Sequence, residues 1–396
     1  MILHCLHPRF ASLSSHHYNE SLALQAECRR RGWPFALYMS VLAPAEIAQA
    51  FDGRRVLDDP TFRLELPYAE RVERFRAQVA TLLDAGICAE DRVLITVATQ
   101  VEALALLRWR EALPPQRRPW LGILILSDRW NRSTRAEYER QVAEYAQVRA
   151  AVQALAPPDA VRVLFFTLTQ SLAQELGAML GTPVAVAPVP LDFTPPPELA
   201  RYRPHARPRV AVLGGLRREK GSHRLPAIVE ACDAARLDID WVLQLVDNGL
   251  APEELAAIER LAQRPHVHSL HGALDVEAYR RALADADLGL FPYEVVPYLK
   301  RNSGVFAEAA AYGKPLLATA GTWMADQIAQ GRAAGHVFAA DDAVAVAETL
   351  QRCLDELPAM RERAVRLAPS WQSGGMAGFL DLIEARIEAA RAAPGA

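Results

Sequence analysis

Residues 209–221 read "RVAVLGGLRREKG", and this stretch decides the fold. Its opening "RVAVL" is a short, largely apolar run of the kind that forms a strand buried on both faces of a sheet. Gly214 and Gly215 follow and allow the backbone to turn tightly. We expect a helix to begin near Ser222, because Pro226 is tolerated in a first helical turn. The order strand, glycine turn, helix is typical of a parallel α/β sheet.

The same alternation of apolar runs and amphipathic stretches continues along the chain in both directions. The strands that we expect in the first half are 2–7, 35–40, 93–99, 120–126, 161–168 and 184–191. Those expected in the second half are 209–215, 240–246, 267–272, 287–293, 315–320 and 335–338. Strands buried on both faces and separated by helices predict two doubly wound, Rossmann-like α/β domains with parallel sheets.

A proline-rich segment, "PPPELARYRPHARPR" at 195–209, interrupts this rhythm and marks the boundary between the two domains. We therefore predict an N-terminal domain over 1–198 and a C-terminal domain over 199–370. The remaining residues, 371–396, carry an aromatic and apolar helical face. We expect this last helix to pack back on the N-terminal domain.

Composition narrows the class of protein. The 44 Lys and Arg residues against 47 Asp and Glu leave a net charge of −3, so no basic field would attract nucleic acid. The longest apolar run, 120–126, is too short to span a bilayer, and the opening residues lack the positive flank and long apolar run expected of a signal peptide. The five cysteines form no CxxC pair and indicate a reducing compartment. We expect a cytoplasmic protein, with peripheral contact at the inner face of the membrane left open.

The loop at 214–221, called the phosphate loop below, carries three cationic side chains after its two glycines: Arg217, Arg218 and Lys220. Free backbone N–H groups at a helix start, together with these cations, would form an anion site suited to a diphosphate. The alternative is an ordinary strand-to-helix turn with solvated charges, because short glycine-rich motifs often match by chance.

A second helix start lies after the strand expected at 287–293. Ser303 is placed to cap this helix, and Gly304 gives close access to its backbone. Glu308 falls just over one turn into the helix, where a carboxylate can accept hydrogen bonds from a ribose diol. The alternative is a surface glutamate stabilised by the helix dipole.

These motifs resemble the retaining, metal-independent glycosyltransferases of family 4, which have the GT-B fold. "GGLRREKG" at 214–221 is similar to the family's "GRLxxxKG" loop, which would place Lys220 on the donor phosphates. Residues 269–293 resemble the run that lines the base pocket, and residues 303–319 resemble the glycine-rich loop, helix and strand that follow. The likeness covers most of the chain. It implies two domains facing across a cleft, with acceptor bound by the first and nucleotide sugar by the second.

The sequence departs from the family pattern at two positions. Gly215 stands where the family has an arginine, and Arg217 or Arg218 is the candidate to supply that charge. Lys300 stands where the family has the first of two glutamates, of which Glu308 would be the second. A lysine there would contact phosphate instead.

Together the two helix starts and the resemblance define a donor site. The predicted donor-binding residues are Gly214, Gly215, Arg217, Arg218, Lys220, Lys300, Ser303, Gly304, Val305 and Glu308. A UDP- or GDP-sugar is the expected co-substrate, and no other cofactor is expected. The expected acceptor is a glycan, a lipid-linked molecule or a small molecule.

Candidates for chemistry in the first domain follow two of its strands. His16, His17 and Asn19 come after the first strand, and Asp128 and Arg129 come after the strand at 120–126. A histidine or aspartate there can orient an acceptor hydroxyl or stabilise charge on the sugar. We predict acceptor binding by His16, His17, Asn19 and Arg129, and we assign catalytic roles to His17, Asp128, Lys220 and Glu308.

Asp285 and Asp287 form a "DAD" string that matches the DxD metal motif of other glycosyltransferases. The pair precedes a strand, at the end away from the ligand edge, so we interpret it as structural and predict no metal.

Other functions stay open at this point. A catalytically silent sugar-nucleotide-binding scaffold is suggested by the changes at Gly215 and Lys300. A related GT-B epimerase or phosphorylase is a further enzyme alternative, although no lysine is evident for a pyridoxal cofactor. A dinucleotide oxidoreductase is disfavoured, because no GxGxxG motif with a downstream acidic residue follows a strand.

Overall fold

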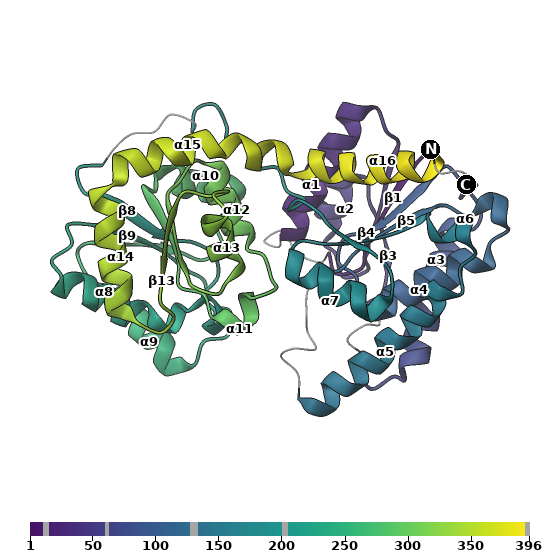
Figure 1. Cartoon of the computed structure of the whole chain (residues 1–396), viewed down its shortest axis with the longest axis horizontal. Coiled ribbons are helices and arrows are strands. Elements are labelled where there is room, and N and C mark those ends of the chain that lie inside the picture. The colour runs from purple at the N-terminus through teal and green to yellow at the C-terminus, as the bar shows by residue number, and fades with distance from the viewer. Residues whose placement is uncertain (11–15, 60–62, 127–133, 200–204, 393–396) are drawn as a thin grey trace. The chain divides into compact units, whose positions relative to one another are not determined.

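The computed structural model of the chain describes residues 1–10, 16–59, 63–126, 134–199 and 205–392. It contains two compact units, the first made of Met1–Asp192 with Gly375–Ala396 and the second of Phe193–Gly374. Each unit has its own sheet with helices on both faces (Figure 1). Within the described residues, no helix combines the length and apolarity needed to cross a membrane.

The sheet of the first unit has seven strands in the order β3-β2-β1-β4-β5-β6-β7, and all of its strand pairs are parallel. The strands are β1 (Leu3–His7), β2 (Phe35–Ser40), β3 (Arg54–Leu57), β4 (Arg92–Ile95), β5 (Trp120–Leu124), β6 (Val163–Thr167) and β7 (Val184–Val186). Every strand expected in this half is confirmed in type.

The strand β3 is absent from the sequence-based prediction. It is a four-residue strand at the edge of the sheet, and three of its residues are exposed. Its sequence, "RRVL", carries two arginines because an edge strand borders solvent. Hydrophobic periodicity therefore could not identify it.

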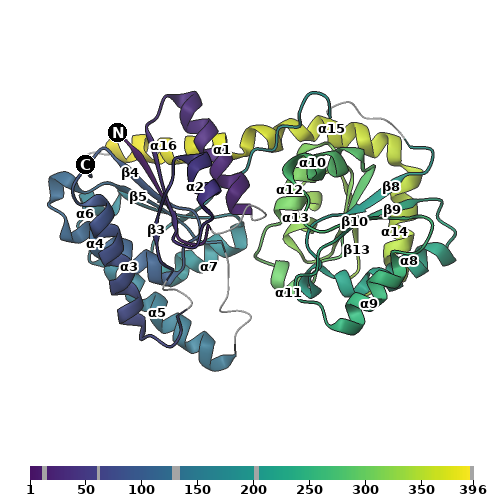
Figure 2. The same cartoon turned by 180° about the vertical axis from the view of Figure 1, so that it is seen from behind.

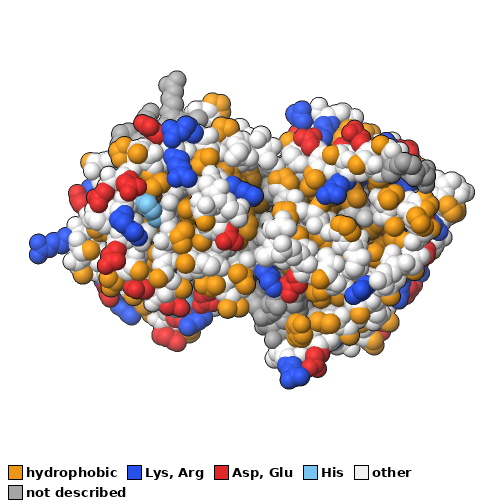
Figure 3. Space-filling model, in the orientation of Figure 1, with side chains coloured by type: hydrophobic (Ala, Val, Ile, Leu, Met, Phe, Trp, Pro, Cys, Tyr) orange, Lys and Arg blue, Asp and Glu red, His pale blue; other side chains and the backbone are white. Residues whose placement is uncertain are grey.

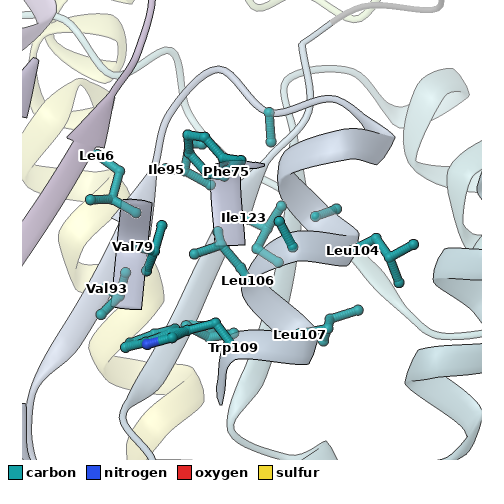
Figure 4. Close-up of a cluster of buried hydrophobic side chains, with 14 of the residues drawn as sticks. Leu6, Phe75, Val79, Val93, Ile95, Leu104, Leu106, Leu107, Trp109 and Ile123 are labelled. Atoms are coloured by element: carbon teal, nitrogen blue, oxygen red, sulfur yellow. The ribbon is translucent and has the colours of Figure 1, made fainter. Parts of the chain in front are cut away.

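Two layers of helices cover this sheet. Buried side chains of α3 (Tyr68–Leu83), α4 (Gln100–Ala112), α5 (Arg135–Gln153) and α7 (Gln170–Leu180) form one core with one face of the sheet. Part of that core is drawn in Figure 4, where Trp109 and Leu106 of α4 lie against the strand residues Val93 and Ile123. A single helical turn, α6 (Pro157–Ala160), lies before β6.

The other face packs on α1 (His16–Arg31), α2 (Ala45–Phe51) and α16 (Met376–Ala392) (Figure 2). The C-terminal helix α16 thus completes the core of the first unit. Its Phe379 is fully buried and meets the ring of Phe166 edge-on, with ring centroids 5.5 Å apart.

The sheet of the second unit has six strands in the order β10-β9-β8-β11-β12-β13, again with all pairs parallel. The strands are β8 (Arg209–Val212), β9 (Asp240–Leu245), β10 (Val267–His271), β11 (Leu288–Phe291), β12 (Leu316–Thr319) and β13 (Gly335–Phe338). Each lies within a run from which it was expected. The prediction of two doubly wound parallel-sheet domains is confirmed.

Helices cover both faces of this sheet as well. One core includes α8 (Leu225–Ala234), α9 (Pro252–Leu261) and α14 (Ala343–Asp355), and the other includes α10 (Val276–Asp285), α12 (Gly304–Ala311) and α13 (Trp323–Ala329). The long α15 (Leu357–Gly374) contributes to both cores, and α11 (Val295–Tyr298) is a single turn after β11.

The helix after the phosphate loop begins later than predicted. Ser222–Arg224 form a 3₁₀ turn, and the α-helix starts at Leu225. Gly221, with φ of +70°, breaks the chain into two short turns before the helix. Pro226 then lies in the first turn of α8, where the missing N–H costs no hydrogen bond.

The strand order places one special point in each sheet. In the first unit the order reverses between β1 and β4, and in the second between β8 and β11. In open α/β sheets, ligands bind outside the carboxyl ends of the strands at such a switch point. The fold therefore directs attention to the loops after β8 and β11, and to those after β1 and β4.

Charged side chains of both signs are interspersed over the face drawn in Figure 3. This agrees with the net charge of −3 from 44 basic and 47 acidic residues. Anion binding would thus depend on local groups rather than on a field of one sign.

Candidate functional site

The phosphate loop leaves the end of β8 at the switch point of the second sheet. Gly214 has a φ of +96°, which favours glycine, and its N–H donates to Gln244 Oε1 at 2.8 Å. The loop is therefore tied to β9, and the N–H of Gly214 is already used. A phosphate here would be met by other groups.

Lys220 is the cation that returns toward the glycines. Its Nζ would lie only 2.8 Å from a Cβ at Gly214, and it stands 5.9 Å from the ring centroid of Tyr293. Burial lowers the pKa of Lys220 to about 8, with the nearby Arg217 guanidinium acting in the same direction. Glu219 and Glu308 act in the opposite direction but do not offset the effect of burial, so the ammonium is held beside a glycine backbone at a cost in desolvation.

Gly221 joins the phosphate loop to the end of β11. A Cβ at this position would lie 1.8 Å from the carbonyl oxygen of Pro292, so only glycine fits without a shift of the backbone. Arg224 donates to the same carbonyl at 3.3 Å, and the N–H of Glu294 donates to the carbonyl of Glu219 at 3.0 Å. The loops after the two switch-point strands are thus packed together.

The start of α12 forms the other side of this site. The Ser303 hydroxyl accepts from the N–H of Phe306 at 3.3 Å, so Ser303 caps the helix as predicted. Gly304 and Val305 occupy its first turn, and a Cβ at Gly214 would meet Val305 at 3.5 Å. The helix start and the phosphate loop are therefore neighbours, although they are about ninety residues apart in the chain.

Glu308 faces the same place from α12. Its Oε2 accepts a hydrogen bond from the Tyr279 hydroxyl at 2.6 Å. Burial raises the pKa of Glu308 to about 7, against the opposing effect of this hydrogen bond and of Lys220. Lys220 and Glu308 are close enough for the charge of each to shift the pKa of the other. The structure thus brings together the phosphate-loop lysine and the predicted ribose carboxylate.

The arginines of the loop are engaged with carboxylates. Arg218 pairs with Glu254 on α9. Glu219 lies between two arginines, 3.8 Å from Arg217 and 3.2 Å from Arg301. Of the charged groups near Lys220, Arg217 lowers its pKa most, and Arg301 lowers it less.

Lys300 lies half-buried in the loop between α11 and α12. It precedes Arg301, whose guanidinium stacks 5.2 Å from the ring of Tyr298. Its predicted contact with phosphate stays a prediction.

Two residues of this site were missed in the sequence. Tyr279 comes from α10 and Gln244 from β9, and each is bound to the site by a side-chain hydrogen bond. Tyr279 lies within residues 269–293, which resemble the run that lines the base pocket, but no local pattern singled out this tyrosine or Gln244.

The carboxylates of the "DAD" string lie at the amino end of β11, opposite the phosphate loop. The ring nitrogens of His205 stand 3.1 Å from Asp285 and 3.0 Å from Asp287. Asp287 also accepts from the backbone N–H of Arg209 at 2.8 Å and lies 3.2 Å from Arg361. These carboxylates connect β8, β11 and α15, which is a structural use.

In the first unit, the predicted acceptor residues His16, His17 and Asn19 lie in the first turn of α1. His17 is buried and packs edge-on against His7 at the end of β1, with ring centroids 4.6 Å apart. Buried Glu20 completes a cluster in which one ligand atom from His7, His17 and Glu20 each lies within 4.8 Å of the others. Two imidazoles and a carboxylate are a donor set that suits zinc. The three side chains would have to move closer together to bind one ion.

Burial raises the pKa of Glu20 to about 8, so its carboxyl is largely protonated at neutral pH. Asn19 is half-buried beside this cluster in the helix. The other two first-unit candidates, Asp128 and Arg129, lie outside the described residues. Their predicted roles stay predictions.

Residues 207–356 match the family model described as glycosyl transferases group 1. No curated protein matches the chain.

Several solved structures share the fold of the whole chain. Sucrose-phosphate synthase from Thermosynechococcus elongatus is 15% identical with a TM-score of 0.61, and 98% of this chain covers 100% of that one. Anabaena HepE was solved with UDP and with UDP-glucose. Its UDP complex is 14% identical with a TM-score of 0.66, and the match covers 98% of this chain and 100% of HepE. WaaG, a glycosyltransferase involved in lipopolysaccharide biosynthesis, is 19% identical with a TM-score of 0.59 over 100% of both chains.

The class that the two parallel sheets and these neighbours define is the GT-B glycosyltransferase fold. Within that class, residues 207–356 of the second unit match the family model of glycosyl transferases group 1. The resemblance to GT-B glycosyltransferases, predicted from the phosphate loop and the helix at 303–313, is thereby confirmed.

Proposed function

We propose that the protein transfers a sugar from a nucleotide diphosphate sugar to an acceptor hydroxyl, and that the second unit holds the donor. The observation that carries this proposal is the meeting of Lys220 and Glu308 at the switch point between β8 and β11. The Lys220 ammonium beside a glycine backbone suits a diphosphate. The Glu308 carboxylate, just over one turn into α12, suits a ribose diol. Both stand in the unit that matches the glycosyl transferase family.

The chemistry needed is stabilisation of a leaving diphosphate. As the bond from the anomeric carbon to phosphate breaks, negative charge grows on the phosphate oxygens. The Lys220 ammonium and the first-turn N–H groups of α12 other than that of Phe306, which Ser303 caps, would be the donors for that charge. We propose that they act without a metal, and that the configuration of the sugar is retained, as the family resemblance implies.

A uridine nucleotide is our first choice of donor. The structurally similar HepE was solved with UDP and with UDP-glucose, which supports testing uridine first. GDP-sugars remain the second choice. We expect the acceptor to engage the first unit around His16, His17, Asn19 and Arg129, with Asp128 in a catalytic role.

Nucleotide-dependent thermal stabilisation tests the donor proposal. Wild type, Lys220→Ala and Glu308→Ala would be melted with UDP, GDP, ADP and dTDP, with and without Mg²⁺. A bound ligand raises the melting temperature by mass action. We expect a Mg²⁺-independent rise with UDP or GDP that both variants lose, and Glu277→Gln, an exposed carboxylate on α10, to behave as wild type.

Slow hydrolysis of the bound donor separates an enzyme from a silent scaffold. Sugar release from the matching UDP- or GDP-sugar in the absence of acceptor supports transfer chemistry. Nucleotide binding with no release and no transfer to any acceptor would favour the scaffold, and no binding of any nucleotide at millimolar concentration would overturn the donor site itself.

A further inference from the structure

The loop after β9 is attached to the phosphate loop by main-chain hydrogen bonds. The N–H of Leu216 donates to the carbonyl of Val246 at 2.7 Å, and the N–H of Asn248 donates back to the carbonyl of Leu216 at 3.1 Å. Leu216 and Asp247 also form a parallel β-bridge. The position of Asn248 beside the phosphate loop is therefore fixed by the backbone.

Asp247 shapes the turn that presents Asn248. Its Oδ1 accepts from the N–H of Gly249 at 3.0 Å and from the N–H of Leu250 at 3.2 Å. This side-chain turn uses the backbone donors that follow Asn248 and holds the tip of the loop. The residue at the tip, Asn248, is exposed.

The side chain of Asn248 lies over Gly215. Its Nδ2 stands 1.8 Å from the place where a Cβ at Gly215 would be, and its Cγ stands 3.0 Å away. The amide therefore fills the space in which any side chain at 215 would begin. On the neighbouring glycine, Gly214, the corresponding place is 2.8 Å from Lys220 Nζ. The two glycines are thus flanked by an amide nitrogen and an ammonium.

The arginines nearby are bound to carboxylates. Arg218 pairs with Glu254, and Arg217 and Arg301 share Glu219. The amide of Asn248 is neutral and carries two N–H donors, which suits a phosphate oxygen next to a lysine.

We propose that Asn248 is a second diphosphate-binding residue, which donates from the loop after β9 to the phosphate held by Lys220. This inference rests on the proposed donor site. It also accounts for Gly215: where the resembling family has an arginine on the phosphate loop, this chain has a glycine and supplies a donor from the adjacent loop. Diphosphate recognition here would then combine one charge with one neutral amide.

The test compares binding of UDP and of uridine to wild type, Asn248→Ala and Asn248→Asp by calorimetry, with GDP and guanosine as the pair if GDP is the nucleotide bound. A hydrogen bond to a charged phosphate predicts a Kd for UDP about tenfold higher in Asn248→Ala. A larger loss is expected in Asn248→Asp, since its carboxylate repels phosphate. Uridine lacks phosphate, so its Kd should be the same in all three proteins. Gln351→Ala, which removes an exposed amide on α14 of the same unit, is the matched control.

A second pair of variants tests whether the Asn248 side chain, from the loop after β9, occupies the space that a side chain at position 215 of the phosphate loop would need. Gly215→Arg alone places its Cβ against the Asn248 amide, so we expect UDP to bind more weakly than to wild type. Adding Asn248→Gly clears that space, and the double variant should bind UDP more tightly than Gly215→Arg. Equal affinity of the single and double variants would contradict the proposed exchange.

The outcomes separate this inference from the donor site. If wild type binds UDP and Asn248→Ala binds it equally well, the role of Asn248 is overturned while the donor site stands. If wild type binds none of the four nucleotides, both fall. Unliganded melting temperatures within a degree or two of each other are expected, because Asn248 is exposed and its variants should fold normally.

Discussion

Lys220 and Glu308 illustrate what burial does to two charged groups in one site. Desolvation lowers the pKa of Lys220 to about 8 and raises that of Glu308 to about 7. Both shifts favour the neutral form, and both place the titration near neutral pH. A bound diphosphate would restore the charge on the lysine, whereas ribose hydroxyls would favour an ionised Glu308.

The charge of Lys220 predicts how nucleotide binding depends on pH. Affinity for UDP should fall as the pH rises through about 8, because the neutral amine does not attract phosphate. In Lys220→Ala the affinity should be at least about tenfold lower and nearly constant between about pH 7 and about pH 9. Calorimetric titrations over that range measure both effects. A wild-type affinity that does not change with pH would argue against a role for this ammonium.

Glu308 predicts a pH-dependent cost in stability. Its folded pKa of about 7 lies above the ordinary value of 4.5, so the protonated form is favoured by folding. The cost of ionising it accumulates as the pH rises from about 4.5 to about 7 and reaches up to about 3 kcal/mol. Relative to Glu308→Gln, wild type should therefore lose stability over that range and then level off.

Urea unfolding of both proteins from about pH 4.5 to about pH 8 checks this expectation. The exposed Glu277→Gln serves as the comparison, since its carboxylate is 73% exposed and should show no such trend. A constant difference between wild type and Glu308→Gln at all pH values would contradict the assignment.

At the scale of elements, the site depends on how two loops fit together. The phosphate loop follows β8 and the Pro292 segment follows β11, and Gly221 is the point at which they touch. Glycine patterning showed that this loop turns tightly. The reason for glycine at 221, a backbone carbonyl within 1.8 Å of any Cβ, is a contact across the sheet that the local sequence does not contain.

Replacement of Gly221 tests that contact. Gly221→Ala combines the strain of a left-handed backbone with a clash against the Pro292 carbonyl, and should cost more than about 2 kcal/mol. Gly272→Ala is the matched control, because Gly272 also has a left-handed φ, of +75°, with no atom within 4 Å of a Cβ. It should cost about 1 kcal/mol. Comparable losses in the two variants, measured by urea unfolding, would show that the clash is relieved cheaply.

Three other features, a helix cap, an edge strand and a hydrogen bond between helices, also divide into those with local causes and those with distant causes. Ser303 was predictable as the cap of α12, because its partner, the N–H of Phe306, is three residues away. The strand β3 was not predictable, because its charged residues reflect its place at the sheet edge. The hydrogen bond between Tyr279 and Glu308 was missed because the two residues lie 29 positions apart on different helices.

At the scale of the molecule, the chain returns to its first unit at the end. The helix α16 lies in the core of that unit with α1 and α2, although it follows the whole of the second unit in sequence. Two carboxylates of α16 also form ion pairs with arginines of the first unit: Asp381 pairs with Arg31, and Glu384 pairs with Arg92. The first unit is therefore incomplete without the C-terminal residues.

Phe379→Ala should weaken the first unit selectively. The ring is fully buried against Phe166, and its removal should cost about 3–5 kcal/mol. Hydrogen exchange should accelerate in β5, β6 and α1 and stay unchanged in the second unit, where UDP should bind as in wild type. Leu42→Ala, at a side chain 77% exposed in the same unit, should be almost neutral. Uniform acceleration in both units would contradict this independence.

The sequence by itself determined twelve of the thirteen strands in the described residues, the capped start of α12 at Ser303, and the likeness of the second unit to glycosyl transferases group 1. These features depend on periodicity, capping and turn chemistry, which act between residues a few positions apart. Only the tertiary structure decided the strand order with its switch points, the meeting of Lys220 with Glu308, and the place of Asn248 over Gly215. Those features join residues that are distant in the chain, and they arise because, within each unit, the pairing of strands in the sheet and the packing of helices on it bring the strand ends together.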